Sequence, residues 1–382
     1  MKVLQFGTGR FLRGFFGPIF MQSGDDLRVT MLQSRAVSKS GDAMRENIRG
    51  GVPVLVRGLR GDELVDVVEE LSVYDEILRL GVDEDLPALL NLACDREMEW
   101  IVSNTTEAGL KLEDGEPKSG ILIQSFPARL CYLLRCRFES GQTAPVVMPT
   151  ELVEDNGQVL KGLVIEQARR WGEDDSFLDW LESDVQWLTT LVDRMVVDVP
   201  SDHELANHPM AVMTEPYSLL AIKQPENESP QTAKVREILD RANGVVTEVL
   251  WTDDLKPIAL QKVRVLNGLH TAMVAHGLPQ GVQTVNQFMD DEERSAWIRR
   301  LLDDEILPVI KGRVSDGSKY AEEVLTRFRN PFFRHRLADI AMAHATKLRT
   351  RLEPTRNEFV ERFGKEPEIL SEILRGDFGK IE

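Results

Sequence analysis

The feature that most constrains the fold is a change of pattern along the chain. In roughly the first 215 residues, short apolar runs alternate with stretches of helical period. Such alternation predicts βαβ units and a parallel sheet. The apolar runs are Val3–Phe6, Leu27–Leu32, Val52–Val56, Glu99–Val102 and Pro145–Met148, and the helical stretches include Leu122–Phe138 and Gln158–Trp171.

After about residue 254 the period is helical almost throughout, and prolines mark the helix ends. The expected helices are Ile258–His276, Glu292–Ile310, Ala321–Arg329, Arg334–Leu352 and Asn357–Leu374. We therefore expect an α/β domain over residues 1–250 and an all-α domain over residues 251–382. The boundary is expected between about 215 and 255.

The charge balance excludes two classes of partner. The chain has 46 Lys and Arg against 63 Asp and Glu, a net charge of −17 over 382 residues. Nucleic acids and anionic membranes both require a basic surface. The three cysteines have no zinc-type spacing, and neither a signal peptide nor an apolar run of about 18 residues occurs. We expect a cytoplasmic, metal-free protein, either a monomer or a homo-oligomer.

A glycine turn follows the first apolar run. Gly7 and Gly9 stand directly before a helix-like stretch, which is the context of a dinucleotide-binding turn. Gly7 permits the tight turn, Gly9 lets the backbone approach a pyrophosphate, and the helix N-terminus offers free N–H groups. Leu12 occupies the place of the third glycine, and Gly14 comes two residues later. The turn predicts a Rossmann-like domain; the alternative is an ordinary strand–helix connection.

Two further segments bear on the cofactor. Arg35 follows the second apolar run where a carboxylate would bind a ribose hydroxyl, so taken alone it favours NADP over NAD. It could equally stack on adenine or face solvent. Asn104, Thr105 and Thr106 end another predicted strand, and ligands of open α/β sheets bind beyond such ends. We expect them near the nicotinamide; the alternative is that they cap the next helix.

The helical stretch after residue 258 carries three polar groups on one side. Taking Lys262 as zero and about 100° per residue, His270 falls near 80° and Asn267 near 140°, interleaved with apolar residues. A cleft wall fits this mixture better than a solvated or a core face does. There a lysine could serve as general acid and base, and an asparagine amide could stabilise an oxyanion. The alternative is a snorkelling lysine beside a satisfied core histidine. Gly268 suggests the close approach of a ligand or backbone.

The spacing Lys-x4-Asn-x2-His resembles the signature of the long-chain, metal-independent mannitol dehydrogenase family of polyol dehydrogenases and uronate reductases. Segments spread over about 350 residues agree in the same order and are similar to its tagaturonate reductase (altronate oxidoreductase) branch. These segments are Gln5–Arg13, Ser103–Gly109, Glu151–Gly157, Leu191–Arg194, Arg329–Phe332 and Asp339–Ala341 followed by Lys347.

The resemblance implies residue roles. Lys262 would be the catalytic acid and base, Asn267 would stabilise the oxyanion, and His270 would orient the substrate. The opening turn would bind the cofactor through Phe6, Gly7, Gly9, Arg10 and Phe11. Family members generally use NAD, which we expect here despite Arg35, although the sequence does not exclude NADP.

The resemblance also implies the activity, an NAD-dependent oxidoreductase that interconverts a keto sugar acid and its hydroxy acid, with tagaturonate and altronate as the expected pair. Glu151 and Leu152 replace an Asp-Asn pair of mannitol dehydrogenases, so a second oxyanion-binding amide is missing, as in the tagaturonate branch. The alternatives are a fructuronate reductase, a mannitol or other polyol dehydrogenase, and a dinucleotide-binding sensor without catalysis.

A basic segment offers partners for a substrate carboxylate. Residues 327–351 hold seven Lys or Arg and one acid, Asp339. Guanidinium and ammonium groups bind carboxylates, and Lys347 and Arg349 are the favoured pair. The alternative is a basic surface paired with the acidic domain. Glu151 and Asp193 are further substrate-side candidates; Asp193 with Arg194 could equally form a structural ion pair.

Overall fold

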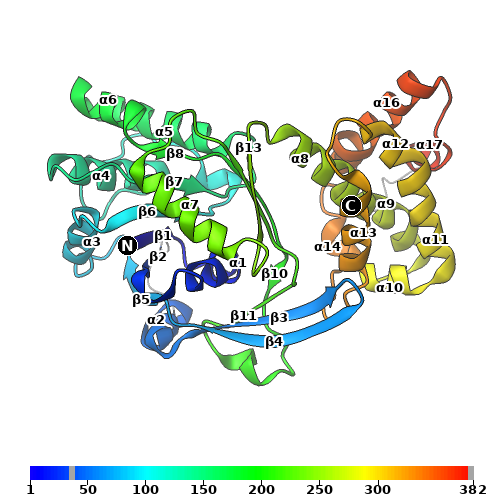
Figure 1. Cartoon of the computed structure of the whole chain (residues 1–382), viewed down its shortest axis with the longest axis horizontal. Helices are drawn as coiled ribbons and strands as arrows, with labels where there is room; N and C mark the ends of the chain where they lie inside the picture. The colour runs from blue at the N-terminus through cyan, green and yellow to red at the C-terminus, as the bar shows by residue number, and fades with distance from the viewer. Residues whose placement is uncertain (34–38, 377–382) are drawn as a thin grey trace. The chain divides into compact units, whose positions relative to one another are not determined.

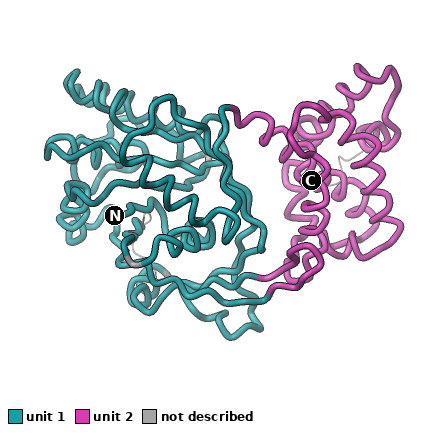
Figure 2. Tube along the Cα trace, viewed as in Figure 1, with its two compact units in different colours: residues 1–56, 66–253 teal, residues 57–65, 254–382 magenta. Residues whose placement is uncertain are grey.

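The chain folds into two compact units. The computed structural model describes residues 1–33 and 39–376. Unit 1 contains Met1–Val56 and Asp66–Asp253, and unit 2 contains Arg57–Val65 and Asp254–Glu382 (Figure 2). The expected division, 1–250 and 251–382, differs chiefly in the hairpin tip Arg57–Val65, which belongs to unit 2.

Unit 1 is built on a six-stranded parallel sheet in the order β5-β2-β1-β6-β7-β8 (Figure 1). Its strands are β1 (Lys2–Phe6), β2 (Arg28–Gln33), β5 (Tyr74–Arg79), β6 (Met98–Ser103), β7 (Val146–Pro149) and β8 (Gln186–Trp187). Four of the five predicted apolar runs form β1, β2, β6 and β7. Their side chains are largely buried, as expected for parallel strands covered on both faces. The predicted Rossmann-like α/β fold is confirmed.

Helices cover both faces of this sheet. On one face, the Trp100 ring of β6 meets Phe16 and Phe20 of α1 edge-on, with ring centroids 5.9 and 5.2 Å apart. The next residue, Ile101, joins a separate core that includes α4 and α5, because successive side chains of a strand point to opposite faces. The helices of unit 1 are α1 (Arg10–Met21), α2 (Lys39–Asn47), α3 (Leu86–Ala93), α4 (Phe126–Glu139), α5 (Asn156–Trp171), α6 (Asp175–Ser183) and α7 (Pro230–Ala242).

Two smaller sheets complete the strands, and the predicted run Val52–Val56 lies in one of them. It forms part of β3, which pairs with β11 in a four-stranded sheet and not with the six parallel strands. An apolar run shows that a strand is buried but not which sheet it joins. The four-stranded sheet contains β10 (Val196–Val197), β11 (Val212–Thr214), β3 (Val52–Arg60) and β4 (Glu63–Leu71); the three-stranded one contains β13 (Glu248–Thr252), β12 (Leu219–Lys223) and β9 (Thr190–Asp193).

Among its described residues, unit 2 is helical apart from the hairpin tip, and aliphatic and aromatic side chains of its helices form the buried core. Three π-helical turns, Lys262–Asn267, Leu301–Ile306 and Leu348–Leu352, interrupt the α-helices. The α-helices are α8 (Lys256–Gln261), α9 (Gly268–Gly277), α10 (Val285–Asp290), α11 (Glu292–Arg300), α12 (Leu307–Ile310), α13 (Gly317–Phe328), α14 (Leu337–Ile340), α15 (His344–Lys347), α16 (Glu353–Phe363) and α17 (Glu368–Arg375).

The expected continuous helix Arg334–Leu352 is wrong in detail. The segment consists of α14, α15 and a π-helical turn, and Ala343 breaks it with a left-handed φ of 56°. Buried residues such as Leu337, His344 and Leu348 keep a helix-like spacing across the break. The hydrophobic period therefore continues across the point where the helix is interrupted.

Candidate functional site

The candidate cofactor residues of unit 1 follow neighbouring strands at one edge of the parallel sheet. Phe6 at the end of β1 pairs with Ser103 of β6, and Ser103 pairs with Pro149 of β7. The segments that begin at Gly7, Asn104 and Thr150 therefore leave the sheet side by side, at the carboxyl edge where open α/β sheets bind ligands.

The glycine turn has the geometry of an anion site. Gly7 has a φ of 115°, which L side chains rarely adopt. A Cβ placed on Gly9 would meet nothing within 4 Å, so the space beside this backbone is open. Gly9 caps α1 without a side-chain hydrogen bond, and the first turn of α1 has no acidic residue. The N–H groups and the positive end of the helix dipole are left to an anionic ligand.

Two side chains, neither predicted from the sequence to do so, hold this turn. The Gln5 amide donates to Gly7 O at 2.8 Å. The buried Arg13 donates to Thr8 O and, through Nε, to Met210 O at 3.0 Å. Burial lowers the pKa of Arg13 to about 10. The sequence carries one signal of this role: Arg13 lies in a largely apolar helical stretch, and a buried guanidinium requires hydrogen-bond acceptors.

The other predicted residues of the turn have different surroundings. Phe6 is buried and contacts Phe126 at a centroid distance of 4.9 Å, and Phe11 stacks on Phe15 at 5.0 Å. Arg10 is exposed and pairs with Asp198. Arg35 lies outside the described residues.

Gly14 explains the missing third glycine. A Cβ at Gly14 would lie 2.7 Å from Thr214 Cγ2 and 2.8 Å from Val196 Cγ1, closer than real Cβ contacts allow. These residues belong to β11 and β10. Gly14 therefore permits close packing of α1 against the four-stranded sheet, a role like that of the third glycine in the usual motif.

The loop after β6 donates two hydrogen bonds to the loop after β7. Asn104 Nδ2 donates to Thr150 O at 2.8 Å, and Thr105 N donates to Glu151 Oε1 at 2.9 Å. Glu151 is only 2% exposed, and burial raises the pKa of its carboxyl. Asn156 Nδ2 in turn donates to Glu151 O at 3.0 Å. The Asn104–Thr106 segment is thus held from the neighbouring strand end.

The raised pKa of Glu151 predicts a pH-dependent stability. Because the folded state holds the proton more tightly than the unfolded state, stability falls as pH rises from the ordinary value of 4.5 through the folded pKa. Glu151→Gln keeps an acceptor for Thr105 N and removes the titration. We expect its melting temperature to gain on that of the wild type as pH rises from about 5 to 8.

Thermal unfolding of both proteins across this pH range measures the effect. The exposed Glu154, on the same loop, provides the control Glu154→Gln. A melting-temperature difference for Glu151→Gln that does not change with pH would contradict the prediction.

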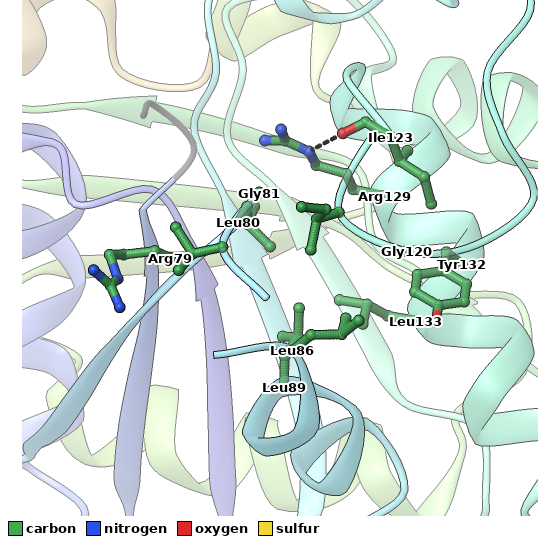
Figure 3. Close-up of a pocket in the computed structure, with 12 residues that line it drawn as sticks. Arg79, Leu80, Gly81, Leu86, Leu89, Gly120, Ile123, Arg129, Tyr132 and Leu133 are labelled. Atoms are coloured by element: carbon green, nitrogen blue, oxygen red, sulfur yellow. Dashed lines mark hydrogen bonds between the residues drawn. The ribbon is translucent and has the colours of Figure 1, made fainter. Parts of the chain in front are cut away.

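A narrow apolar pocket opens beyond the end of β5. Arg79 of β5 pairs with Gln33, the last residue of β2. As Figure 3 shows, aliphatic side chains from the β5–α3 connection, α3 and α4 surround the pocket, and Arg129 Nε donates to Ile123 O at 2.8 Å. The Arg79 guanidinium is held by Asp85 at 2.8 and 3.1 Å. The lining residues include Leu80, Val82, Leu86, Leu89, Ile121, Ile123, Tyr132 and Leu133.

The predicted catalytic residues of unit 2 lie on one helical segment. The half-buried Lys262 and Asn267 begin and end the π-helical turn that joins α8 to α9, and the buried His270 follows on α9. The π-turn changes the assumed 100° spacing, which the sequence could not show; such turns are frequent at functional sites. A Cβ at Gly268 would make only ordinary contacts of 3.6 Å, so no close approach within unit 2 requires this glycine.

His270 sits against aromatic rings. Its ring centroid lies 4.5 Å from that of Phe328 and 4.9 Å from that of His335, at a steep angle to the latter. Thr271 Oγ1 donates to Asn267 O at 2.8 Å. Within residues 1–33 and 39–376, the Asn267 side-chain amide makes no hydrogen bond. It is therefore available to a ligand oxygen.

The remaining substrate candidates belong to both units. Lys347, at the end of α15, is half-buried, and Nζ donates to Ile340 O at 2.6 Å; Arg349 is exposed, with Thr346 Oγ1 3.5 Å from Nη2. Asp193 is buried at the end of β9 in unit 1. Arg194 donates to Gly14 O at 2.8 Å and to Thr214 Oγ1 at 3.0 Å. These bonds give Arg194 a structural role.

Two features are absent from the described residues. These residues contain no helix long and apolar enough to cross a membrane. In the same part of the chain, no group of three or more His, Cys, Asp or Glu side chains is arranged to hold a metal ion.

The chain is similar to dehydrogenases along nearly its whole length. The mannitol dehydrogenase Rossmann domain matches residues 1–234, and the mannitol dehydrogenase C-terminal domain matches residues 254–371. The altronate oxidoreductase of Halalkalibacterium halodurans is 37% identical, covering 97% of this chain and 73% of that protein. The altronate oxidoreductase of Bacillus subtilis is 34% identical, covering 97% and 77%.

Solved structures share the fold. A substrate-free D-sorbitol dehydrogenase superposes with a TM-score of 0.78 at 16% identity, covering 98% of this chain and 80% of that one. The mannitol 2-dehydrogenase of Pseudomonas fluorescens, solved with NAD and D-mannitol, superposes with a TM-score of 0.71 at 20% identity, covering 98% and 77%.

Proposed function

Since the chain belongs to the mannitol dehydrogenase family, we propose that it is an NAD-dependent oxidoreductase that interconverts tagaturonate and altronate, a keto sugar acid and its hydroxy acid. The observation that carries this proposal is the Lys262–Asn267–His270 segment, which lies inside the region matched by the family's C-terminal domain. The substrate assignment is supported by relatives named altronate oxidoreductase at 37% and 34% identity.

The residues of unit 1 fit a dinucleotide. The open space beside Gly9 and the uncapped N-terminus of α1 suit a pyrophosphate. The Asn104–Thr106 backbone, held by Glu151, offers a fixed surface on the nicotinamide side. When bound, the nicotinamide supplies or accepts the hydride.

The residues of unit 2 handle the substrate oxygen and its proton. In the reduction, Lys262 gives a proton to the keto oxygen, and in the oxidation it takes that proton from the hydroxyl. The Asn267 amide donates to the same oxygen as negative charge develops there. His270, held between Phe328 and His335, orients the substrate through a hydrogen bond.

An absorbance assay tests the proposed reaction. NADH consumption is followed with tagaturonate, fructuronate and fructose in turn, and with NADPH in place of NADH. We expect the highest kcat/KM with tagaturonate and NADH. A preference for fructuronate or fructose would assign a different dehydrogenase activity, and tight NADH binding without turnover of any sugar would indicate a sensor.

A further inference from the structure

The basic segment of unit 2 places two cations on one side of a helix. Lys347 ends α15, and Arg351 lies four residues later in the π-helical turn Leu348–Leu352. Residues four apart share a helix side, whereas Arg349, two residues on, faces away from Lys347. Both Lys347 and Arg351 are half-buried, and Arg349 is exposed. Arg351 was not among the residues expected to bind substrate.

Arg351 reaches the helix that carries the candidate catalytic residues. Its Nη1 lies 3.3 Å from Thr271 Oγ1 as a hydrogen-bond donor. Thr271 follows His270 in α9, and its hydroxyl donates to Asn267 O. The guanidinium is therefore one hydroxyl away from the Asn267–His270 turn.

The groups around Arg351 and Lys347 are mostly basic. Burial lowers the pKa of both, and the charge of Arg351 lowers that of Lys347 further. Burial, then the charges of Lys347 and Arg351, lower the pKa of His344. Burial also lowers the pKa of His335; the exposed Asp339 opposes this shift, and the charge of Lys347 adds to it. Such a cluster favours the binding of an anion, because an anion would offset the repulsion between its cations.

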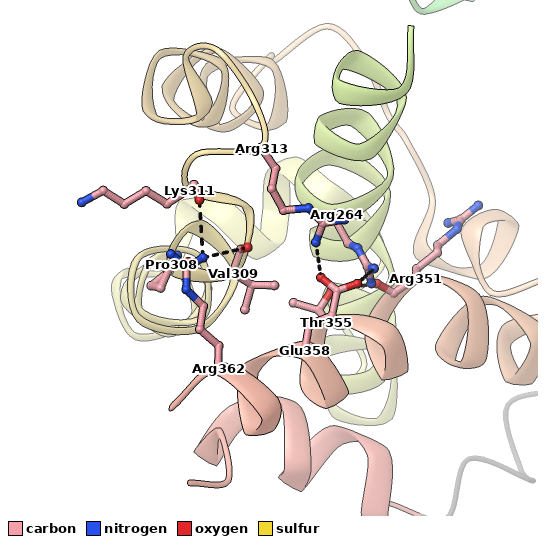
Figure 4. Close-up of polar contacts among 9 residues, drawn as sticks. All are labelled: Arg264, Pro308, Val309, Lys311, Arg313, Arg351, Thr355, Glu358 and Arg362. Atoms are coloured by element: carbon pink, nitrogen blue, oxygen red, sulfur yellow. Dashed lines mark hydrogen bonds and ion pairs between the residues drawn. The ribbon is translucent and has the colours of Figure 1, made fainter. Parts of the chain in front are cut away.

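A carboxylate of the protein lies close by, but it is engaged elsewhere. Glu358 accepts from Arg264 at 2.8 Å and from Arg313 at 2.5 Å. Figure 4 shows these two guanidinium groups converging on Glu358, whereas that of Arg351 points away from it. Among the residues that the structure describes, neither Lys347 nor Arg351 forms an ion pair.

We infer that Arg351, together with Lys347, binds the carboxylate of the substrate and selects sugar acids over neutral sugars. This inference rests on the proposed function. Lys262, Asn267 and His270 handle the keto group. The Arg351 guanidinium, 3.3 Å from Thr271 Oγ1, offers the carboxylate a planar pair of donors. The carboxylate is the feature that distinguishes a sugar acid from a neutral sugar.

Substitution at Arg351 tests the inference. Arg349→Gln is the matched control, because the exposed Arg349 faces away from Lys347 and, unlike the expectation from the sequence, has no part in the site inferred here. We expect Arg351→Gln to raise KM for tagaturonate at least about tenfold, as loss of a charged hydrogen bond implies, with a smaller change in kcat and unchanged NADH affinity. Arg351→Lys keeps the charge but loses the planar donors, so its KM should lie between those of the wild type and Arg351→Gln.

The outcomes separate the two proposals. A wild-type enzyme without turnover of any sugar acid overturns the proposed function. A wild type that reduces tagaturonate, with Arg351→Gln no different in KM from Arg349→Gln, overturns only the role of Arg351. Melting temperatures show whether Arg351→Gln folds; if it does not, an unchanged KM in Arg351→Lys overturns the inference.

Discussion

Lys262→Ala is expected to lower kcat by roughly 10²–10⁴-fold, the usual contribution of a general acid and base. The half-buried ammonium at the start of the π-helical turn is the proposed donor to the keto oxygen, and alanine leaves that oxygen without its proton source. NADH affinity and the melting temperature should change little, because the residues proposed to bind the dinucleotide belong to unit 1. Steady-state kinetics with tagaturonate, NADH titration and thermal unfolding measure the three quantities.

Lys256→Ala provides the matched control for this lysine. Lys256 is exposed at the start of α8, the helix that leads into the same π-helical turn. Its removal should leave kcat close to the wild-type value. Wild-type turnover in Lys262→Ala, or an equal loss in Lys256→Ala, would contradict the role of Lys262.

Gly9→Val is expected to raise the dissociation constant for NADH by roughly 10²-fold or more, about 2.7 kcal/mol, without unfolding the protein. Gly9 has an ordinary φ of −63°, and nothing lies within 4 Å of the position of its Cβ, so a side chain fits the free protein. The valine would occupy the space that the proposal gives to the pyrophosphate. Fluorescence titration with NADH measures the affinity.

Gly14→Ala should mainly lower stability, whereas Gly9→Val should mainly lower NADH affinity. Its Cβ would press against Thr214 and Val196 at 2.7 and 2.8 Å, and such overpacking typically costs about 1–3 kcal/mol of stability. We expect a lower melting temperature and a smaller loss of NADH affinity than in Gly9→Val. Normal NADH binding in Gly9→Val would contradict the phosphate site.

The sequence predicted the local elements well because their signals are local. The buried strand β1, the glycine turn and the start of α1 occupy consecutive residues, and β6 ends at Ser103, one residue after the predicted run Glu99–Val102. Apolar periodicity could also assign the later residues to helices, since each helix buries one side in the core of unit 2.

Contacts between distant parts of the chain could not be predicted. Arg194 binds the carbonyl of Gly14, 180 residues away, and no pattern in the sequence links the two. Position 14 also requires glycine because Val196 and Thr214 pack against it, and no sequence pattern indicates that contact. Charge alone predicts Lys347 and Arg349 as the carboxylate partners. In the folded chain it is Arg351 that contacts Thr271.

The transfer of hydride to the keto sugar acid is the central claim, and isotope transfer tests it most directly. Tagaturonate is reduced with NADH that carries deuterium at C4, in each of its two stereochemical forms, and the product is weighed by mass spectrometry. We predict altronate heavier by one mass unit with one of the two forms and unlabelled altronate with the other. Unlabelled altronate with both forms, or no altronate at all, would contradict the account.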